Sequence, residues 1–223
     1  MSYQTSVLIM NERSQVLVRQ SERPLKLPRV TVEPGRAGIS LVRAARDQLD
    51  IGVFCLVPAT STDGAPPPLR LQSMRPEAPN GFRWVDACDC DVDCDHTQIS
   101  QVLSKFSPTD QEFGQYAWYP AVQDWLTGEI SRCGYVIRSL EQWNGRVGGV
   151  LLRVVTNGPQ FWFKAVSDFN AREIGIAQLL ASTHPEHFPR VVATQPAWNA
   201  FLLEHLDGIE LYDCDDLDRK SVV

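Results

Sequence analysis

The 223-residue sequence has no long hydrophobic run and no cluster of basic residues. No apolar stretch approaches the roughly 20 residues that cross a bilayer, and residues 1–4 lack the charged head and apolar body of a secretory signal. Lys and Arg total 21 against 27 Asp and Glu, for a formal net charge of −6. This acidic balance disfavours nonspecific binding to nucleic acid or to an anionic membrane. We therefore expect a cytoplasmic protein with neither kind of partner.

The composition excludes wholesale disorder. Hydrophobic residues make up 43% of the chain and charged residues 22%, which is close to the average of folded globular proteins. The length is enough for one large domain or two small ones. The question is therefore how the chain divides and which parts carry chemistry.

Three of the six cysteines and one of the four histidines lie between residues 88 and 96. Zinc prefers such ligands, but structural zinc sites usually draw C-x₂₋₄-C pairs from two separated segments. Here the cysteines are separated by one and by three residues, with aspartates between them. We interpret the segment as an acidic surface turn and assign no metal ligand. The alternative zinc site would use Cys88, Cys90, Cys94 and His96.

The first half of the chain alternates short apolar runs with turn residues, and one segment has helical periodicity. Leu41, Ala44, Ala45 and Leu49 fall on one face of a helix expected over residues 40–49, with Gly52 as its stop. The expected strands are 6–10, 15–19, 27–32, 53–57, 69–71 and 82–85, and further helices are expected over 98–106 and 120–130.

Residues 1–127 resemble a Nudix-like domain, which implies a mixed α/β fold. A Nudix hydrolase needs carboxylates that converge on magnesium beside a pyrophosphate. Asp47 and Asp50 are expected to share a helix face, with Glu33 upstream. Where the family motif has two consecutive glutamates, however, this sequence has Leu49 and Asp50, and the motif is one residue too short. We expect a non-catalytic domain. A Mg-dependent pyrophosphohydrolase is the alternative, and convergence of these three carboxylates would favour it.

The second half begins a new block of strands near residue 137. The first strand is expected to begin there, further strands are expected over 150–155, 160–166, 189–194 and 200–204, and a helix over 170–182 that Asn170 or Asp168 could cap. The expected order is therefore three strands, one helix and two strands.

A single lysine, Lys164, lies inside the aromatic strand sequence FWFKAV. Burying an unpaired ammonium is costly, so a partner is expected, and Glu173 on the following helix is the natural one. A lysine on a rigid strand, held by a carboxylate of the next helix, is one way to bind nucleotide phosphates. The glycine-rich connection at residues 144–149 would let backbone amides approach phosphates.

Residues 140–208 resemble the N-terminal lobe of the aminoglycoside phosphotransferase family, which has a protein-kinase-like fold. The resemblance implies that Lys164 contacts the phosphates of ATP and that Glu173 holds Lys164. It also implies that a glycine loop covers the nucleotide and that a hinge segment meets adenine. The glycines would be Gly145, Gly148 and Gly149, and the hinge residues Glu204, His205 and Leu206.

The family's catalytic lobe has no counterpart in this sequence. Only 15 residues follow Gly208, and they contain no His-Gly-Asp motif. We therefore expect an α+β chain with a Nudix-like domain (1–127), a connector (128–139) and a nucleotide-binding lobe (140–223) truncated before the catalytic lobe. The full-length parent would be an ATP- and Mg-dependent kinase of a small molecule, and this chain alone would be inactive, with no catalytic residue assigned. A non-catalytic binding or regulatory module is a further alternative.

Overall fold

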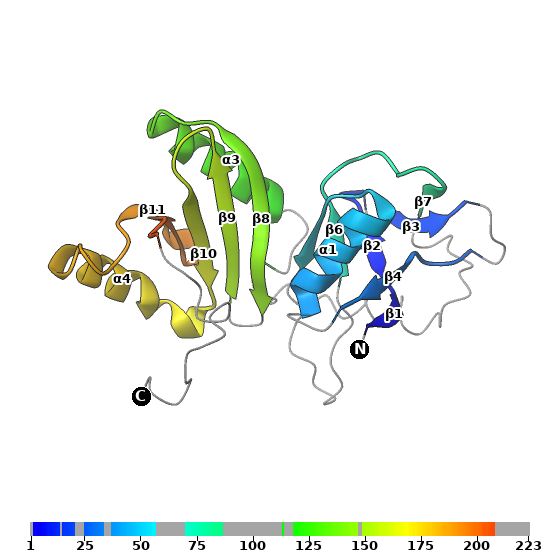
Figure 1. The fold of residues 1–223 in the computed structure, drawn as a ribbon, viewed down its shortest axis with the longest axis horizontal. Coiled ribbons are helices and arrows are strands. Elements are labelled where there is room, and N and C mark those ends of the chain that lie inside the picture. Colours follow the sequence, from blue (N-terminus) through cyan, green and yellow to red (C-terminus); the bar gives the residue numbers. More distant parts are fainter. Residues whose placement is uncertain are drawn as a thin grey trace.

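A computed structural model describes residues 2–13, 15–20, 25–33, 37–56, 70–86, 113, 118–146 and 149–207. These residues form two units, each built around a five-stranded sheet (Figure 1). Helices and mostly antiparallel strands occupy separate segments of the chain, so the expected α+β fold class is confirmed. The expected helix over 98–106 and the cysteine-rich turn lie outside the described residues.

The first unit has a mixed five-stranded sheet in the order β5-β6-β2-β3-β7, in which only β2 and β6 run parallel. A second, two-stranded sheet pairs β1 with β4. The expected strand over 6–10 is split at Val7, because β1 pairs with β4 in the small sheet whereas β2 pairs with β3 and β6 in the large one; the Val7 amide donates to the carbonyl of Pro28 (2.9 Å). The strands are β1 Tyr3–Ser6, β2 Leu8–Met10, β3 Gln15–Arg19, β4 Arg29–Val32, β5 Val53–Leu56, β6 Arg70–Ser73 and β7 Phe82–Asp86.

Helix α1 (Ala37–Leu49) covers one face of this unit. The predicted apolar face is confirmed, since its four residues all lie in the core formed with the strands: Leu41, Ala44, Ala45 and Leu49. The expected stop at Gly52 is wrong. The helix ends at Leu49, and Asp50 follows in the left-handed region at a φ of 52°, which turns the chain out of the helix.

The second unit has an antiparallel sheet in the order β11-β12-β10-β9-β8. Its elements follow the expected order of three strands, one helix and two strands. They are β8 Ile137–Arg146, β9 Gly149–Thr156, β10 Phe161–Val166, α4 Arg172–Thr183, β11 Val191–Gln195 and β12 Ala200–Glu204, with short 3₁₀ turns η3 Asp168–Asn170 and η4 Pro196–Trp198.

The expected caps of the helix after β10 are wrong. The residue that precedes α4 is Ala171, which offers no side-chain cap. Asn170 and Asp168 instead belong to η3. The carboxylate of Asp168 accepts a hydrogen bond from the side-chain amide of Asn199 (2.7 Å), so it ties η3 to the turn before β12.

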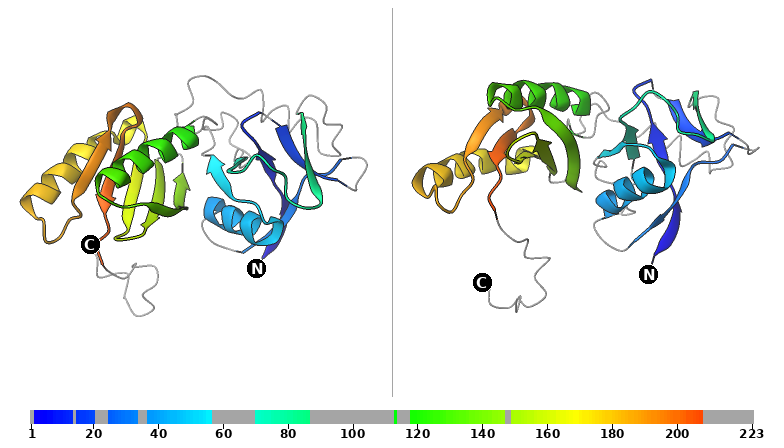
Figure 2. Two further views of the ribbon diagram at one scale, coloured as in Figure 1. Left: turned by 90° about the horizontal axis from the view of Figure 1, so that it is seen from above. Right: turned by 45° about the horizontal axis from the view of Figure 1, so that its top comes forward.

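Helix α3 (Trp118–Arg132) packs on one face of the second sheet (Figure 2). Alternate residues of β9 and β10 meet the apolar side of α3, as the two-residue period of a strand requires. The expected boundary at residue 127 therefore falls inside α3, a helix that belongs to the core of the second unit. That core includes Val150, Leu152, Val154, Phe161, Phe163 and Ala165 from the strands, and Trp118, Val122, Leu126 and Ile130 from α3.

The two units meet at the edges of their sheets, where α1 and β5 contact β8. The side-chain amide of Gln142 on β8 binds the backbone of Cys55 on β5 twice, accepting from its N–H (2.8 Å) and donating to its carbonyl (3.0 Å). Phe54, 1% exposed, reaches into the core of the second unit and stacks on Tyr119 with ring centroids 4.3 Å apart. The first unit thus contributes a side chain to the core of the second.

Within the described part of the chain, no helix is both long and apolar enough to cross a membrane.

Candidate functional site

The candidate site lies on the face of the second sheet that α3 leaves open. Along β10, Phe161, Phe163 and Ala165 are buried against α3, so Trp162 and Lys164 point to the other face. There the ammonium of Lys164 contacts the carboxylate of Glu173, the second residue of α4. The structure therefore brings together the lysine and the glutamate that the sequence pairs.

This ion pair is accessible to a ligand. The side chains of Lys164 and Glu173 are 35% and 38% exposed. An ammonium has three N–H donors, and among the described residues only Glu173 accepts one from Lys164. The remaining donors can bind an anion that approaches from solvent. A half-exposed pair of this kind contributes little to stability, so its main physical effect is to hold the lysine in place.

Trp162 lies beside Lys164 on this face, and its indole is held from two sides. Its N–H donates to Nδ1 of His205 (2.9 Å), which follows β12. Its ring meets that of Trp143 edge to face, with centroids 5.7 Å apart and an interplanar angle of 79°. Trp118 is buried in the core of the second unit, whereas Trp162 lies on the open face, as its alternation with the buried residues of β10 indicates.

Two arginines approach the ring of Trp143. The guanidinium of Arg153 on β9 lies 5.2 Å from the ring centroid, and that of Arg43 on α1 lies 5.9 Å away. Arg153 also forms an ion pair with Glu141 on β8 (2.6 Å), so its charge is balanced. Nothing in the sequence alone indicates a role for Arg43 or Arg153. Their contacts depend on strand register, with Glu141 opposite Arg153 and Arg153 opposite Trp162.

The expected hinge residues lie next to the site, but most of their amides are already used. The amide of Glu204 donates to the carbonyl of Arg190 (3.0 Å), and that of His205 donates to the carbonyl of Gln160 (3.2 Å). Among the described residues, the Leu206 amide has no backbone acceptor. A base at this strand end could therefore receive a backbone hydrogen bond from Leu206 but not from the two residues before it.

The glycines expected to cover a nucleotide are only partly placed. Gly145 lies in β8 opposite Val150, and Gly148 lies outside the described residues. Gly149 has a packing reason of its own, because a Cβ there would lie 2.5 Å from the carbonyl oxygen of Ala165 on β10. The close approach of β9 to β10 thus requires glycine at this position whether or not a ligand binds.

In the first unit, the carboxylates proposed for magnesium do not assemble into a site. Asp47 pairs with its neighbour Arg46 (3.1 Å) in solvent. Asp50 lies beyond the end of α1 and does not share its face. Glu33 joins no such site either, because within the described ranges no three His, Cys, Asp or Glu side chains are grouped so that they could hold a metal ion. The cysteines of the alternative zinc site are outside those ranges.

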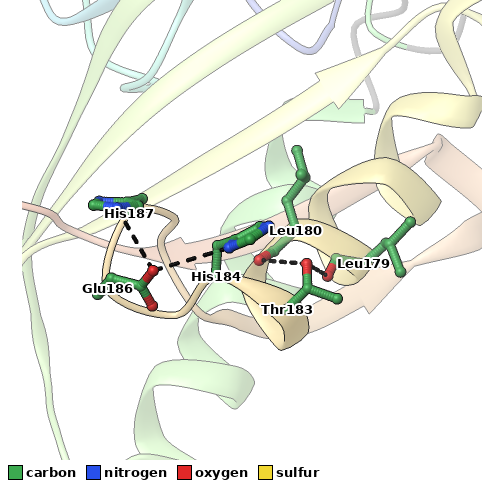
Figure 3. A network of polar contacts seen from close by, with 6 residues as sticks. All are labelled: Leu179, Leu180, Thr183, His184, Glu186 and His187. Atoms are coloured by element: carbon green, nitrogen blue, oxygen red, sulfur yellow. Dashed lines mark hydrogen bonds and ion pairs between the residues drawn. The ribbon is translucent and has the colours of Figure 1, made fainter.

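A second polar cluster occupies the turn after α4 (Figure 3). His184 Nδ1 and His187 Nε2 both face Oε1 of Glu186, at 3.9 and 3.5 Å. The Thr183 hydroxyl donates to the Leu179 carbonyl (2.9 Å) in the last turn of the helix. All three ionisable side chains are exposed, so the cluster is a solvated helix end.

Comparison of the chain with protein-family models, with curated proteins and with solved structures found no match. Function must therefore be inferred from the arrangement of these side chains.

Proposed function

We propose that the second unit is the nucleotide-binding lobe of an ATP-dependent small-molecule phosphotransferase, as the resemblance to the aminoglycoside phosphotransferase family implies. The contact between Lys164 and Glu173 carries the proposal. In kinase-like enzymes a lysine on the third strand contacts the phosphates, and a glutamate on the next helix holds it. Lys164 lies on the third strand of this sheet, and Glu173 on the helix that follows.

The residues present fit a nucleotide in two respects. Lys164 keeps N–H donors that no described residue accepts, which suits phosphate oxygens. Leu206, in the expected hinge segment after β12, keeps a backbone N–H that could donate to a base. Bound ATP would supply the phosphoryl group, while Lys164 would orient the phosphates and Glu173 would orient Lys164. No described residue is assigned to magnesium.

For this chain the proposal is limited to binding. Its sequence has no His-Gly-Asp motif of the catalytic loop that the resemblance calls for, so transfer to a hydroxyl of a small molecule is proposed only for the full-length parent. Of the alternatives, the pyrophosphohydrolase gains no converging carboxylates among the described residues. A supporting role suits the first unit, because its contacts with β8 hold the edge of the second sheet.

The test is calorimetric titration of the whole chain with MgATP. We expect binding by the wild type, at least tenfold weaker binding by Lys164→Ala, and a smaller loss in Glu173→Gln, where the lysine remains but is no longer held by a charge. Arg132→Ala is the matched control, because it removes a 73% exposed cation that pairs with Glu129 on α3, on the other side of the sheet. Equal affinities of Lys164→Ala and the wild type, or no binding by a folded wild type at millimolar MgATP, would contradict the proposal.

A further inference from the structure

The hydrogen bond between Trp162 and His205 fixes the protonation state of the imidazole. An indole N–H can only donate, so the Nδ1 atom that it contacts at 2.9 Å must carry a lone pair. His205 is therefore neutral in this state, with its proton on Nε2. Its side chain is 28% exposed, so protons from solvent can reach it.

One charged group, Asp207, faces the imidazole and pairs with no other described residue. The Asp207 carboxylate lies 3.9 Å from Nε2 and is fully exposed. On the neighbouring described elements, three ion pairs balance six charged groups, whereas Arg138 on β8 and Arg172 on α4 form no ion pair with a described residue. These pairs are Arg153 with Glu141 on β9 and β8, Lys164 with Glu173 on β10 and α4, and Arg190 with Glu204 before β11 and on β12. Protonation of His205 would therefore gain attraction to Asp207 and lose the bond from Trp162.

We propose that the Trp162–His205 hydrogen bond is a proton-controlled latch between the lysine-bearing strand β10 and the segment that follows β12. Protonation places hydrogen on Nδ1, which then cannot accept from the indole, and the imidazolium is drawn through Nε2 toward Asp207. Histidine is the side chain whose charge ordinarily changes between about pH 5 and 8. The latch is closed while Nδ1 carries its lone pair and open once Nδ1 is protonated.

The indole N–H of Trp162 reports the latch directly. In ¹⁵N–¹H spectra of the full chain, the peak that disappears in Trp162→Phe is the one to follow from pH 8 to pH 5. We expect an upfield shift of its proton in the wild type. We expect no such transition in His205→Gln, whose amide does not titrate.

His187→Gln is the matched control, because it removes an exposed histidine that pairs with Glu186 in the turn after α4, and its curve should coincide with that of the wild type. A Trp162 peak that does not move between pH 8 and 5, or that moves equally in His205→Gln, would overturn the latch. Backbone amide dispersion shows for each variant whether it is folded.

A second measurement rests on the proposed nucleotide site, because Trp162 and Lys164 share one face two residues apart. The change in affinity for MgATP between pH 8 and 5 should be larger in the wild type than in His205→Gln, because protonation of the nucleotide's own phosphate acts on both proteins alike. Absence of nucleotide binding at every pH would refute the nucleotide site, while the indole titration would still decide the latch. Binding with the same pH dependence in both proteins would show that the latch does not act on the site.

Discussion

Replacing Phe54 by Ala should destabilise the second unit, although Phe54 belongs to a strand of the first. The ring is 1% exposed and lies in the core cluster of the second unit, stacked on Tyr119 and 6.1 Å from the ring of Trp118. Removal of a buried Phe side chain costs about 3–5 kcal/mol, from lost burial and the cavity that remains. For a chain of this size, that loss lowers the melting temperature by roughly 6–20 °C.

Urea denaturation followed by tryptophan fluorescence is the assay, because five of the six tryptophans lie in the second unit. They are Trp118, Trp125, Trp143, Trp162 and Trp198. Phe54→Ala should therefore move the fluorescence transition to lower urea. Phe169→Ala is the matched control, since that ring is 94% exposed, and its free energy of unfolding should stay within about 0.5 kcal/mol of the wild type.

Two results would refute the reasoning. Phe54→Ala could shift the fluorescence transition no more than Phe169→Ala does, which would mean that Phe54 is not part of the second core. Alternatively, circular dichroism could show early loss of structure while the fluorescence transition stays in place. The two units would then unfold independently, and the contact between their edges would contribute no coupling.

Two further predictions concern the same junction. Gln142→Leu removes both side-chain hydrogen bonds to the backbone of Cys55 and should lower the free energy of unfolding in urea by about 1–3 kcal/mol. Gln48→Leu removes a similar double contact with the exposed backbone of Thr31 and should lower it less. An equal or larger loss in Gln48→Leu would contradict this. Burial raises the pKa of the Cys55 thiol to about 12, so iodoacetamide at pH 8 should label the half-buried Cys133 but not Cys55 until urea is added, as peptide mass spectrometry would show. Because that pKa is raised in the folded state, the contribution of Cys55 to stability is complete below pH 9 and is lost as the pH rises toward 12. Labelling of Cys55 in the native protein as fast as that of Cys133 would contradict its burial.

Local patterns were sufficient to predict most elements of the fold. The expected strands 15–19 and 200–204 coincide with β3 and β12, because an apolar run bounded by turn residues specifies a strand without help from the rest of the chain. Helix ends were less predictable. Asp50 rather than Gly52 ends α1, because a short polar side chain also tolerates the left-handed conformation.

Pairing between distant elements was beyond the sequence argument. The partition at residue 127 followed the resemblance of residues 1–127 to a Nudix-like domain and missed that α3 packs on the second sheet, since an amphipathic helix does not reveal which sheet covers its apolar face. Gln142 is an ordinary polar residue in the sequence. Its role depends on β5 and β8 both being edge strands that meet, and edge position is a property of the assembled sheets.

Sequence separation explains why one half of the candidate site was foreseen and the other was not. Lys164 and Glu173 are nine residues apart, joined by one turn and the start of a helix, so the local order of elements is enough to pair them. Trp162 and His205 are 43 residues apart, and they meet only because β12 inserts between β10 and β11. That insertion puts the end of β12 beside the lysine strand and places a titratable side chain against the indole. The same strand order thus creates the proposed hinge position and places beside it the histidine of the proposed latch.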